Sequence, residues 1–300
     1  MSQIRNLNEL AQAAGRTRSR LPRVAVVCPA DDSTRTAVTM ALEAGMADIT
    51  LYCTPGCEPL DSKGRDELLR TLTFDDPDSA ARQAVTDARE GRVDVVMKGL
   101  INTDNLMRAI LNKEWGILSP GAVLSHITVA ELPGRDKLLL FTDAAVIPSP
   151  TLDQRRAQVR YLADACRRLG IERPAIALVH CTEKTSPKFP VTLDYAALRD
   201  DAAAGAFGDV DLDGPMDAKT ACDAHSAEVK GIHSSVCGRA DALLMPEIES
   251  GNIFYKALTC FAHAITAGLV VGSKVPVVVP SRSDSAQSKF YSLALACMMA

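Results

Sequence analysis

The chain lacks an excess of positive charge. Its formal net charge is −4, and Lys and Arg together number 33 against 37 Asp and Glu. No run of Lys or Arg interrupts this balance. Because proteins that bind nucleic acids usually present a basic face, the composition argues against a nucleic-acid partner.

The chain also lacks a long apolar run. The most apolar stretch, residues 261–280, is interrupted by His263, Lys274 and Pro276, which argues against a membrane span. The first residues, 1–6, form no apolar signal region. We therefore expect a cytoplasmic protein without a membrane partner.

Several common catalytic motifs are missing. The sequence contains no P-loop, no Gly-x-Gly-x-x-Gly after its first strand, no Gly-x-Ser-x-Gly and no His-Glu-x-x-His. ATP hydrolysis, ordinary dinucleotide binding and serine hydrolysis lose support. The nine cysteines are odd in number and scattered, which indicates reduced thiols. Cys53 and Cys57 form the closest pair, but without a second ligand pair two ordinary thiols are favoured over a zinc site. No metal is expected.

What the chain does contain is an alternation of short β-branched runs with longer helical patterns, which predicts an α/β fold with a mostly parallel sheet. Strands are expected at residues 24–28, 49–53, 93–97, 138–142, 175–179, 242–245 and 275–279. Helices are expected at 33–44, 79–90, 104–112, 151–169, 252–267 and 286–299. The Gly- and Asp-rich segment 205–215 is expected to be irregular.

Prolines suggest where domains meet. Pro148 and Pro150 flank a serine, and the prolines of residues 276–280 indicate a second break. We predict a first α/β domain of residues 1–148 plus 280–300 and a second of residues 149–279. A cleft between two such domains is where ligands tend to bind.

The most informative segment is residues 277–285, Val-Val-Val-Pro-Ser-Arg-Ser-Asp-Ser. A strand ends at a proline, polar groups follow, and a helical pattern begins at about residue 286. Free N–H groups at a helix N-terminus attract anions, and an arginine holds one through two parallel hydrogen bonds. The pattern predicts a phosphate-like group beside Ser281 and Arg282.

Other strand ends carry further candidates. Lys98 ends an apolar strand, where a charge is costly unless it is used. Gly99 would let a ligand approach the backbone, Thr103 could cap the next helix, and Arg108 follows about one turn later. A helix cap and a solvated face explain Thr103 and Arg108 equally well.

The remaining candidates allow two readings each. Asp143 follows the strand at 138–142 and is either a base or a turn cap. Asn252 follows another strand and either lines a cleft or belongs to a helix cap. Ser125 and His126 form one more pair, although a single His is more often structural.

These residues resemble the phosphate acetyl/butyryltransferase family, and its phosphate butyryltransferase branch more closely. The resemblance covers nearly the whole chain after Pro22. Its matching segments are Met97-Lys98-Gly99 with Thr103, Ser125-His126, residues 142–145, 192–194 and 213–215, Gly251-Asn252 with Tyr255-Lys256, and Ser281-Arg282 with Asp284, Ser285 and Lys289.

The resemblance implies a fold similar to isocitrate and isopropylmalate dehydrogenases, with two α/β domains and a cleft between them. It also implies a homodimer or a higher homo-oligomer. The implied reaction is reversible: acyl-CoA and inorganic phosphate give acyl phosphate and coenzyme A by direct thiolate attack in a ternary complex, with no cofactor.

The roles that the resemblance implies are specific. Arg282, Lys98 and Arg108 would hold phosphate, and Ser281 would stabilise the oxyanion. Ser125, His126, Gly99, Thr103 and Asn252 would help to bind substrate. Where the acetyl branch carries its proposed base, residues 286–288 here are Ala-Gln-Ser, so Asp284, or else Asp143, is expected to be the base.

Two rival functions remain. One is a non-catalytic sensor of coenzyme A or acyl phosphate, suggested by the missing carboxylate. The other is an NAD-dependent decarboxylating dehydrogenase of the same fold, which would need an aspartate cluster for a metal, and no such cluster stands out. The branch resemblance favours a butyryl group, with acetyl and propionyl as alternatives.

Overall fold

The computed structural model describes residues 2–15 and 20–300. The chain divides into two compact units, each described here by itself. Unit 1 comprises Met1–Arg5 and Ser125–Ile265, and unit 2 comprises Asn6–Leu124 and Thr266–Ala300. As in the sequence-based prediction, the C-terminal end belongs with the N-terminal half of the chain.

The bounds of the units differ from the predicted ones at 148/149 and 279/280. Strand β5 (Ser125–Glu131) pairs with β6 (Leu139–Thr142), and β6 pairs with β9 (Ala242–Leu244), so residues 125–148 belong to unit 1. Strand β11 (Val277–Val278) pairs with β4 (Val95–Lys98), which places it in unit 2. The prolines that were expected to mark domain boundaries therefore lie inside the units: Pro148 and Pro150 in unit 1, and Pro276 and Pro280 in unit 2.

Unit 2 is built on parallel strands. Strands β3 (Leu69–Thr73), β2 (Asp48–Cys53), β1 (Arg23–Val27), β4 and β11 lie side by side in that order and all run parallel. Strand β10 (Ile265–Val271) follows β11 and is antiparallel to it. The Val residues of β1, β4 and β11 are almost fully buried, as expected where helices cover both faces, whereas the edge strand β3 is mostly exposed.

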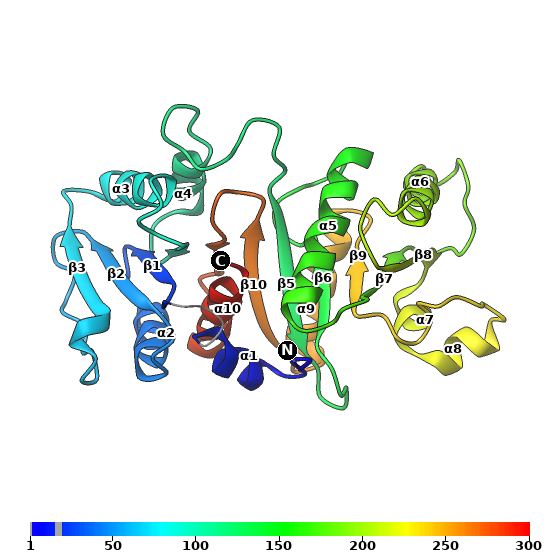
Figure 1. The fold of residues 1–300 in the computed structure, drawn as a ribbon, viewed down its shortest axis with the longest axis horizontal. Helices are drawn as coiled ribbons and strands as arrows, with labels where there is room; N and C mark the ends of the chain where they lie inside the picture. Colours follow the sequence, from blue (N-terminus) through cyan, green and yellow to red (C-terminus); the bar gives the residue numbers. More distant parts are fainter. Residues whose placement is uncertain (1, 16–19) are drawn as a thin grey trace. The chain divides into compact units, whose positions relative to one another are not determined.

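Helices cover the two faces of this sheet (Figure 1). Helices α1 (Leu7–Ala14), α2 (Asp32–Glu43) and α10 (Ala286–Met299) pack together on one face. Helices α3 (Pro77–Arg89) and α4 (Thr103–Ile110) pack together on the other. A short 3-10 helix, η1 (Asp66–Leu68), precedes β3. The carboxyl ends of β1, β4 and β11 therefore come to one edge, next to the start of α2, α4 and α10.

Unit 1 has strand order β5-β6-β9-β7-β8, with β7 at Ala175–Val179 and β8 at Asp211–Met216. All its strands are parallel except β5, which is antiparallel to β6. Its helices are α5 (Leu152–Arg168), α6 (Val191–Ala203), α7 (Ala218–Cys222), α8 (Ala224–Val229) and α9 (Ile248–Phe261). One apolar cluster, which includes Phe141, Leu243 and Met216, joins strands to helices.

The α/β class is confirmed, and most predicted elements lie within a few residues of their expected place. Two predictions are wrong. Helix α9 ends at Phe261, and residues 265–271 form β10 instead of continuing the helix. The segment expected to be irregular, 205–215, contains most of β8. Across residues 2–15 and 20–300, no helix combines the length and the apolar character that crossing a membrane requires.

Candidate active site

Lys98 is a buried cation at the carboxyl end of β4. Its strand lies between β1 and β11, with Lys98 in register with Val27. The side chain is only 3% exposed, and Nζ donates a hydrogen bond to the Gly99 carbonyl at 3.2 Å. Burial lowers the pKa of Lys98, and the positive charges of Arg282 and Lys289 lower it further. Within the described residues, no carboxylate lies within ion-pair distance of this ammonium.

Arg282 lies in the loop after β11. Its Nη2 donates to Oδ1 of Asn102 at 2.8 Å, so its partner there is a neutral amide. The loop is held by the Ser281 N–H, which donates to Asp284 Oδ2 at 2.7 Å, and by a 3.0 Å contact between the Ser281 and Ser283 hydroxyls. We call Lys98, Asn102 and Arg282 the Lys98–Arg282 cluster.

The start of α4 differs from the prediction that Thr103 caps it. Asn102 occupies the N-cap position, Thr103 is the first helical residue, and no side chain caps the helix. The Asn102 oxygen accepts from Arg282 instead. The start of α4 is therefore tied to the Arg282 loop.

Gly99 is required for a close backbone approach. A Cβ at this position would lie 2.3 Å from the Cys28 carbonyl oxygen, which no side chain tolerates. The Leu100 N–H donates to the same oxygen at 2.8 Å. Gly99 thus lets the loop after β4 pack on the loop after β1. The sequence predicted only that Gly99 would let a ligand approach the backbone.

Lys289 and Asp31 complete this edge, and their roles were missed in the sequence. Lys289 on α10 is 3% exposed and donates to Asp31 Oδ1 at 2.7 Å, Ser33 Oγ at 2.7 Å and Thr34 Oγ1 at 3.0 Å. Asp31 also caps α2, because its Oδ1 accepts from the Thr34 N–H at 2.9 Å. Burial opposes ionisation of Asp31, but the hydrogen bonds from Lys289, Thr34 and Ser33 outweigh it and hold its pKa well below the ordinary range. The sequence signal that could have identified Lys289 is its position as a charged residue in the largely apolar helix α10.

Asp143 lies in unit 1, just after β6, and is 1% exposed. Its Oδ2 accepts from Ser125 Oγ at 2.9 Å, from the His126 N–H at 3.2 Å and from the Ile147 N–H at 3.2 Å. Its Oδ1 accepts from the Ala145 and Val146 N–H groups at 2.8 and 2.9 Å.

Other buried polar groups surround this carboxylate. Thr142 lies 3.0 Å from the Ser125 hydroxyl, and Gln158 donates to that hydroxyl at 3.2 Å. We call Ser125, Thr142, Asp143 and Gln158 the Asp143 network. Its contacts are those of a group that fixes a turn, and they favour the turn-cap reading of Asp143.

Asn252 on α9 lies beside this network. Its Nδ2 donates to the Ala144 carbonyl at 3.1 Å, while a Cβ on Gly251 would lie 2.0 Å from the Asp143 carbonyl oxygen. His126 Nδ1 lies 3.4 Å from the Thr128 hydroxyl. The contacts of Asn252 and Gly251 dock α9 onto the loop after β6, while the His126 contact lies within β5.

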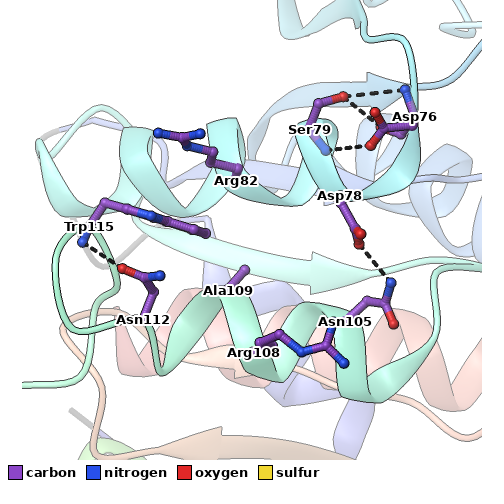
Figure 2. Close-up of a pocket in the computed structure, with 9 residues that line it drawn as sticks. All are labelled: Asp76, Asp78, Ser79, Arg82, Asn105, Arg108, Ala109, Asn112 and Trp115. Atoms are coloured by element: carbon purple, nitrogen blue, oxygen red, sulfur yellow. Dashed lines mark hydrogen bonds between the residues drawn. The ribbon is translucent and has the colours of Figure 1, made fainter.

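Arg108 is exposed on α4 and lines a pocket between α3 and α4 with a volume of about 360 Å³. Figure 2 shows its lining residues, which include Trp115, Asn112 and Arg82. The Arg82 guanidinium lies over the Trp115 ring at 5.3 Å. Arg108 is not among the charges that shift the pKa of Lys98.

The structure thus gathers Lys98, Gly99 and Arg282 at one strand edge, with Ser281 and Asp284 in the adjoining loop and Thr103 at the start of α4. It gathers Ser125, His126, Asp143 and Asn252 at an edge of the other unit. Among residues 2–15 and 20–300, no three His, Cys, Asp or Glu side chains are grouped so that they could hold a metal ion.

This fold and these strand-end residues define an α/β protein with a candidate anion site, and comparison with known proteins gives its family. Residues 71–297 match the family described as "Phosphate acetyl/butaryl transferase". The chain therefore belongs to the phosphate acetyl/butyryltransferase family, as the resemblance indicated.

Individual relatives carry both names. A phosphate butyryltransferase of Clostridium acetobutylicum is 39% identical over 74% of this chain and 73% of its own. A phosphate acetyltransferase of Thermotoga maritima is 37% identical over 75% and 76%. The crystal structure of a branched-chain phosphotransacylase from Enterococcus faecalis superimposes with a TM-score of 0.82 at 30% identity, covering 93% of this chain and 98% of that one.

Proposed function

We propose that this protein is a phosphate acyltransferase that interconverts acyl-CoA plus inorganic phosphate with acyl phosphate plus coenzyme A. The observation that carries the proposal is Lys98, a cation that is 3% exposed and stands beside Arg282. A buried charge without a counter-charge is costly, so a bound phosphate dianion would remove that cost. Membership of the family supports the same reaction.

Arg282 is suited to orient the phosphate. A guanidinium can give two parallel hydrogen bonds to two phosphate oxygens, whereas Lys98 acts as a point charge. Helix α10 contributes less than the sequence suggested, because the Ser288 N–H already donates to the capping Ser285 hydroxyl. The two side chains, more than the helix end, would then fix the anion.

Ser281 and Asp284 would act at the reacting carbonyl. Phosphate attacks the thioester carbon, and the Ser281 hydroxyl donates to the oxygen that becomes negative. In the reverse direction a base removes the thiol proton of coenzyme A, because an ordinary thiol with a pKa of about 8.5 is mostly protonated near neutral pH. We propose Asp284 for this step ahead of Asp143, because Asp143 already accepts five hydrogen bonds.

The pocket between α3 and α4 offers a place for the nucleotide end of coenzyme A. An indole ring, amide groups, the Arg108 and Arg82 guanidiniums and two carboxylates line it (Figure 2). The ring suits an aromatic base and the two guanidiniums suit phosphates. We keep Arg108 as a substrate-binding residue on this ground. Ser125, His126 and Asn252 stay predictions as substrate contacts, with a backbone-fixing role equally consistent with their hydrogen bonds.

For the acyl group we propose butyryl or a chain of similar length. The support is the branch resemblance of the sequence, while acetyl and propionyl are the competing substrates. Transfer without a cofactor, a homodimeric or higher assembly, a cytoplasmic location and a cleft between domains like that of isocitrate and isopropylmalate dehydrogenases stay predictions.

The test is release of free coenzyme A from acetyl-CoA, propionyl-CoA and butyryl-CoA with and without inorganic phosphate. Wild type, Arg282→Ala and the exposed control Arg65→Ala are compared. Phosphate-dependent release that falls by at least about 100-fold in Arg282→Ala alone supports the proposal and ranks the acyl chains. Binding of coenzyme A without phosphate-dependent release from any thioester would refute it and favour the sensor.

A further inference from the structure

Cys53 and Cys57 are brought together by a tight turn at the end of β2. The intervening residues are Thr54-Pro55-Gly56, and Gly56 adopts a φ of +85°, a region that glycine reaches readily. The Cys57 N–H donates to the Thr54 carbonyl at 3.1 Å. The two sulfur atoms lie 2.9 Å apart, and both residues are free thiols.

Both sides of this turn are anchored. The Phe74 N–H, just after β3, donates to the Cys53 carbonyl at the end of β2 at 2.9 Å. Beyond Cys57, the carbonyls of Glu58 and Pro59 accept from the Arg35 guanidinium at 3.1 and 2.7 Å. The sulfur atoms are therefore held near each other by contacts that do not involve the thiols.

The two thiols differ in access. Cys53 is 2% exposed, and burial together with the neighbouring Cys57 thiol raises the pKa of Cys53 to about 12. Cys57 is half-buried. Because a thiolate, not a thiol, attacks an oxidant, Cys57 is placed to react first and Cys53 to complete a bond.

We propose that Cys53 and Cys57 form a reversible intramolecular disulfide when the protein meets a peroxide. A disulfide needs sulfurs about 2.05 Å apart, so a shift of less than about 1 Å joins them. This modification site is independent of the proposed acyl transfer.

The reaction balances with a peroxide as the oxidant. The Cys57 thiolate attacks one oxygen of hydrogen peroxide, the O–O bond breaks, and the departing hydroxide takes up the thiol proton as water. The Cys53 sulfur then attacks the sulfenic sulfur of Cys57. The S–O bond breaks, the S–S bond forms, and the second water leaves with the Cys53 proton. Two thiols lose two electrons to one peroxide.

The test is peroxide treatment of the intact protein, alkylation of remaining thiols and tryptic mass spectrometry. Arg35 and Lys63 bound a single peptide that holds both cysteines and no other. We expect this peptide to lose two hydrogens, to resist alkylation at both sulfurs, and to recover both thiols with dithiothreitol. Cys57→Ser should leave Cys53 alkylated.

The exposed cysteines Cys181 and Cys260 serve as internal controls, because each is expected to gain oxygen without bridging. Full alkylation of Cys53 and Cys57 at a peroxide concentration that oxidises Cys181 would overturn the proposal. So would a cross-link from Cys57 to the peptide that carries Cys28, or oxygen gain at Cys57 without a bridge.

Discussion

Two strand ends of this protein each bury a charged side chain, but they differ in how far neighbouring groups compensate the charge. At the end of β4, Lys98 is 3% exposed, and its pKa is lowered by burial and by the cations Arg282 and Lys289, against which Asp31 acts more weakly. After β6, Asp143 is 1% exposed and accepts five hydrogen bonds. The positive charge of Lys98 is poorly compensated by its surroundings, whereas hydrogen-bond donors surround the negative charge of Asp143.

The difference teaches what each residue is for. A satisfied buried carboxylate stabilises the turn that surrounds it, since each hydrogen bond to a charged group contributes about 1.5–3 kcal/mol. A buried cation among cations lowers stability, so its presence indicates a ligand that supplies the missing negative charge. Removing the two charges should therefore change stability in opposite directions.

The largest effect is expected from Lys98→Met, which keeps the stem and removes the charge. We expect the rate of phosphate-dependent coenzyme A release to fall by about 10³-fold, the upper range for losing one group that stabilises a transition-state charge. The melting temperature should rise by about 2 °C, because a desolvated charge without a counter-charge has been removed. Steady-state kinetics and calorimetry on the same preparation measure both.

Lys113→Met is the matched control, because Lys113 is exposed in the same unit. It should leave both the rate and the melting temperature near wild type. A Lys98→Met protein that melts lower than wild type would mean that the ammonium is a structural group, and the contrast with Asp143 would be lost.

Asp143→Asn should lower the free energy of unfolding by about 3 kcal/mol. An amide group turned toward either set of donors places its NH₂ against N–H groups that now donate to a carboxylate oxygen. Urea denaturation followed by circular dichroism measures the change. Asp136→Asn, whose side chain is 86% exposed in the same unit, should be near neutral.

Activity separates the two readings of Asp143. If the folded fraction of Asp143→Asn retains a rate within about tenfold of wild type, the residue fixes the turn. A fully stable Asp143→Asn protein with a rate loss of about 10³-fold would instead make Asp143 the base and displace Asp284.

The contrast between the two edges also explains what the sequence could predict. Lys98 was found because it follows an apolar run, and Arg282 because it follows a strand and precedes a helix. Asp143 was found by the same rule, but its five donors are mostly backbone groups, which sequence patterns do not locate. Sequence patterns do not identify Lys289 as a site residue, because its partner Asp31 lies 258 positions away in the chain.

Local sequence patterns predicted the wrong secondary structure in two segments where pairing between strands determines it. Residues 252–267 are apolar enough for one long helix, yet 265–271 form β10, which pairs with β11. Residues 211–216 include Asp, Gly and Pro, which disfavour strands, yet they form β8 beside β7. Tertiary pairing overrode composition in both places.

A smaller effect is expected from Asn102, which orients Arg282. Asn102→Ala should raise the KM for phosphate by about tenfold with little change in kcat, because one hydrogen bond to an exposed guanidinium is lost. Asn102→Asp should raise it further, because a carboxylate there competes with phosphate for Arg282. A lower KM in Asn102→Asp would show that Arg282 does not hold the anion.

The smallest effect is expected from Asp31 and concerns how the free energy of unfolding falls at low pH. The pKa of Asp31 in the folded protein lies below its unfolded value of about 3.9, because the hydrogen bonds from Lys289, Thr34 and Ser33 outweigh burial. Its stabilising contribution is therefore complete above about pH 4 and is lost as the pH falls from there toward the folded-state pKa.

We expect Asp31→Asn to flatten the fall in stability between about pH 4 and pH 2, by at most about 1.4 kcal/mol per pH unit, the limit for one proton. Urea denaturation across this range measures the slope for both proteins. Asp94, whose pKa is also held low by Arg20 and Arg23 despite its burial, is present in both and cancels in the difference. Equal slopes would mean that the hydrogen bonds from Lys289, Thr34 and Ser33 do not hold Asp31 ionised, and this strand edge would then lack the carboxylate that neutralises Lys289.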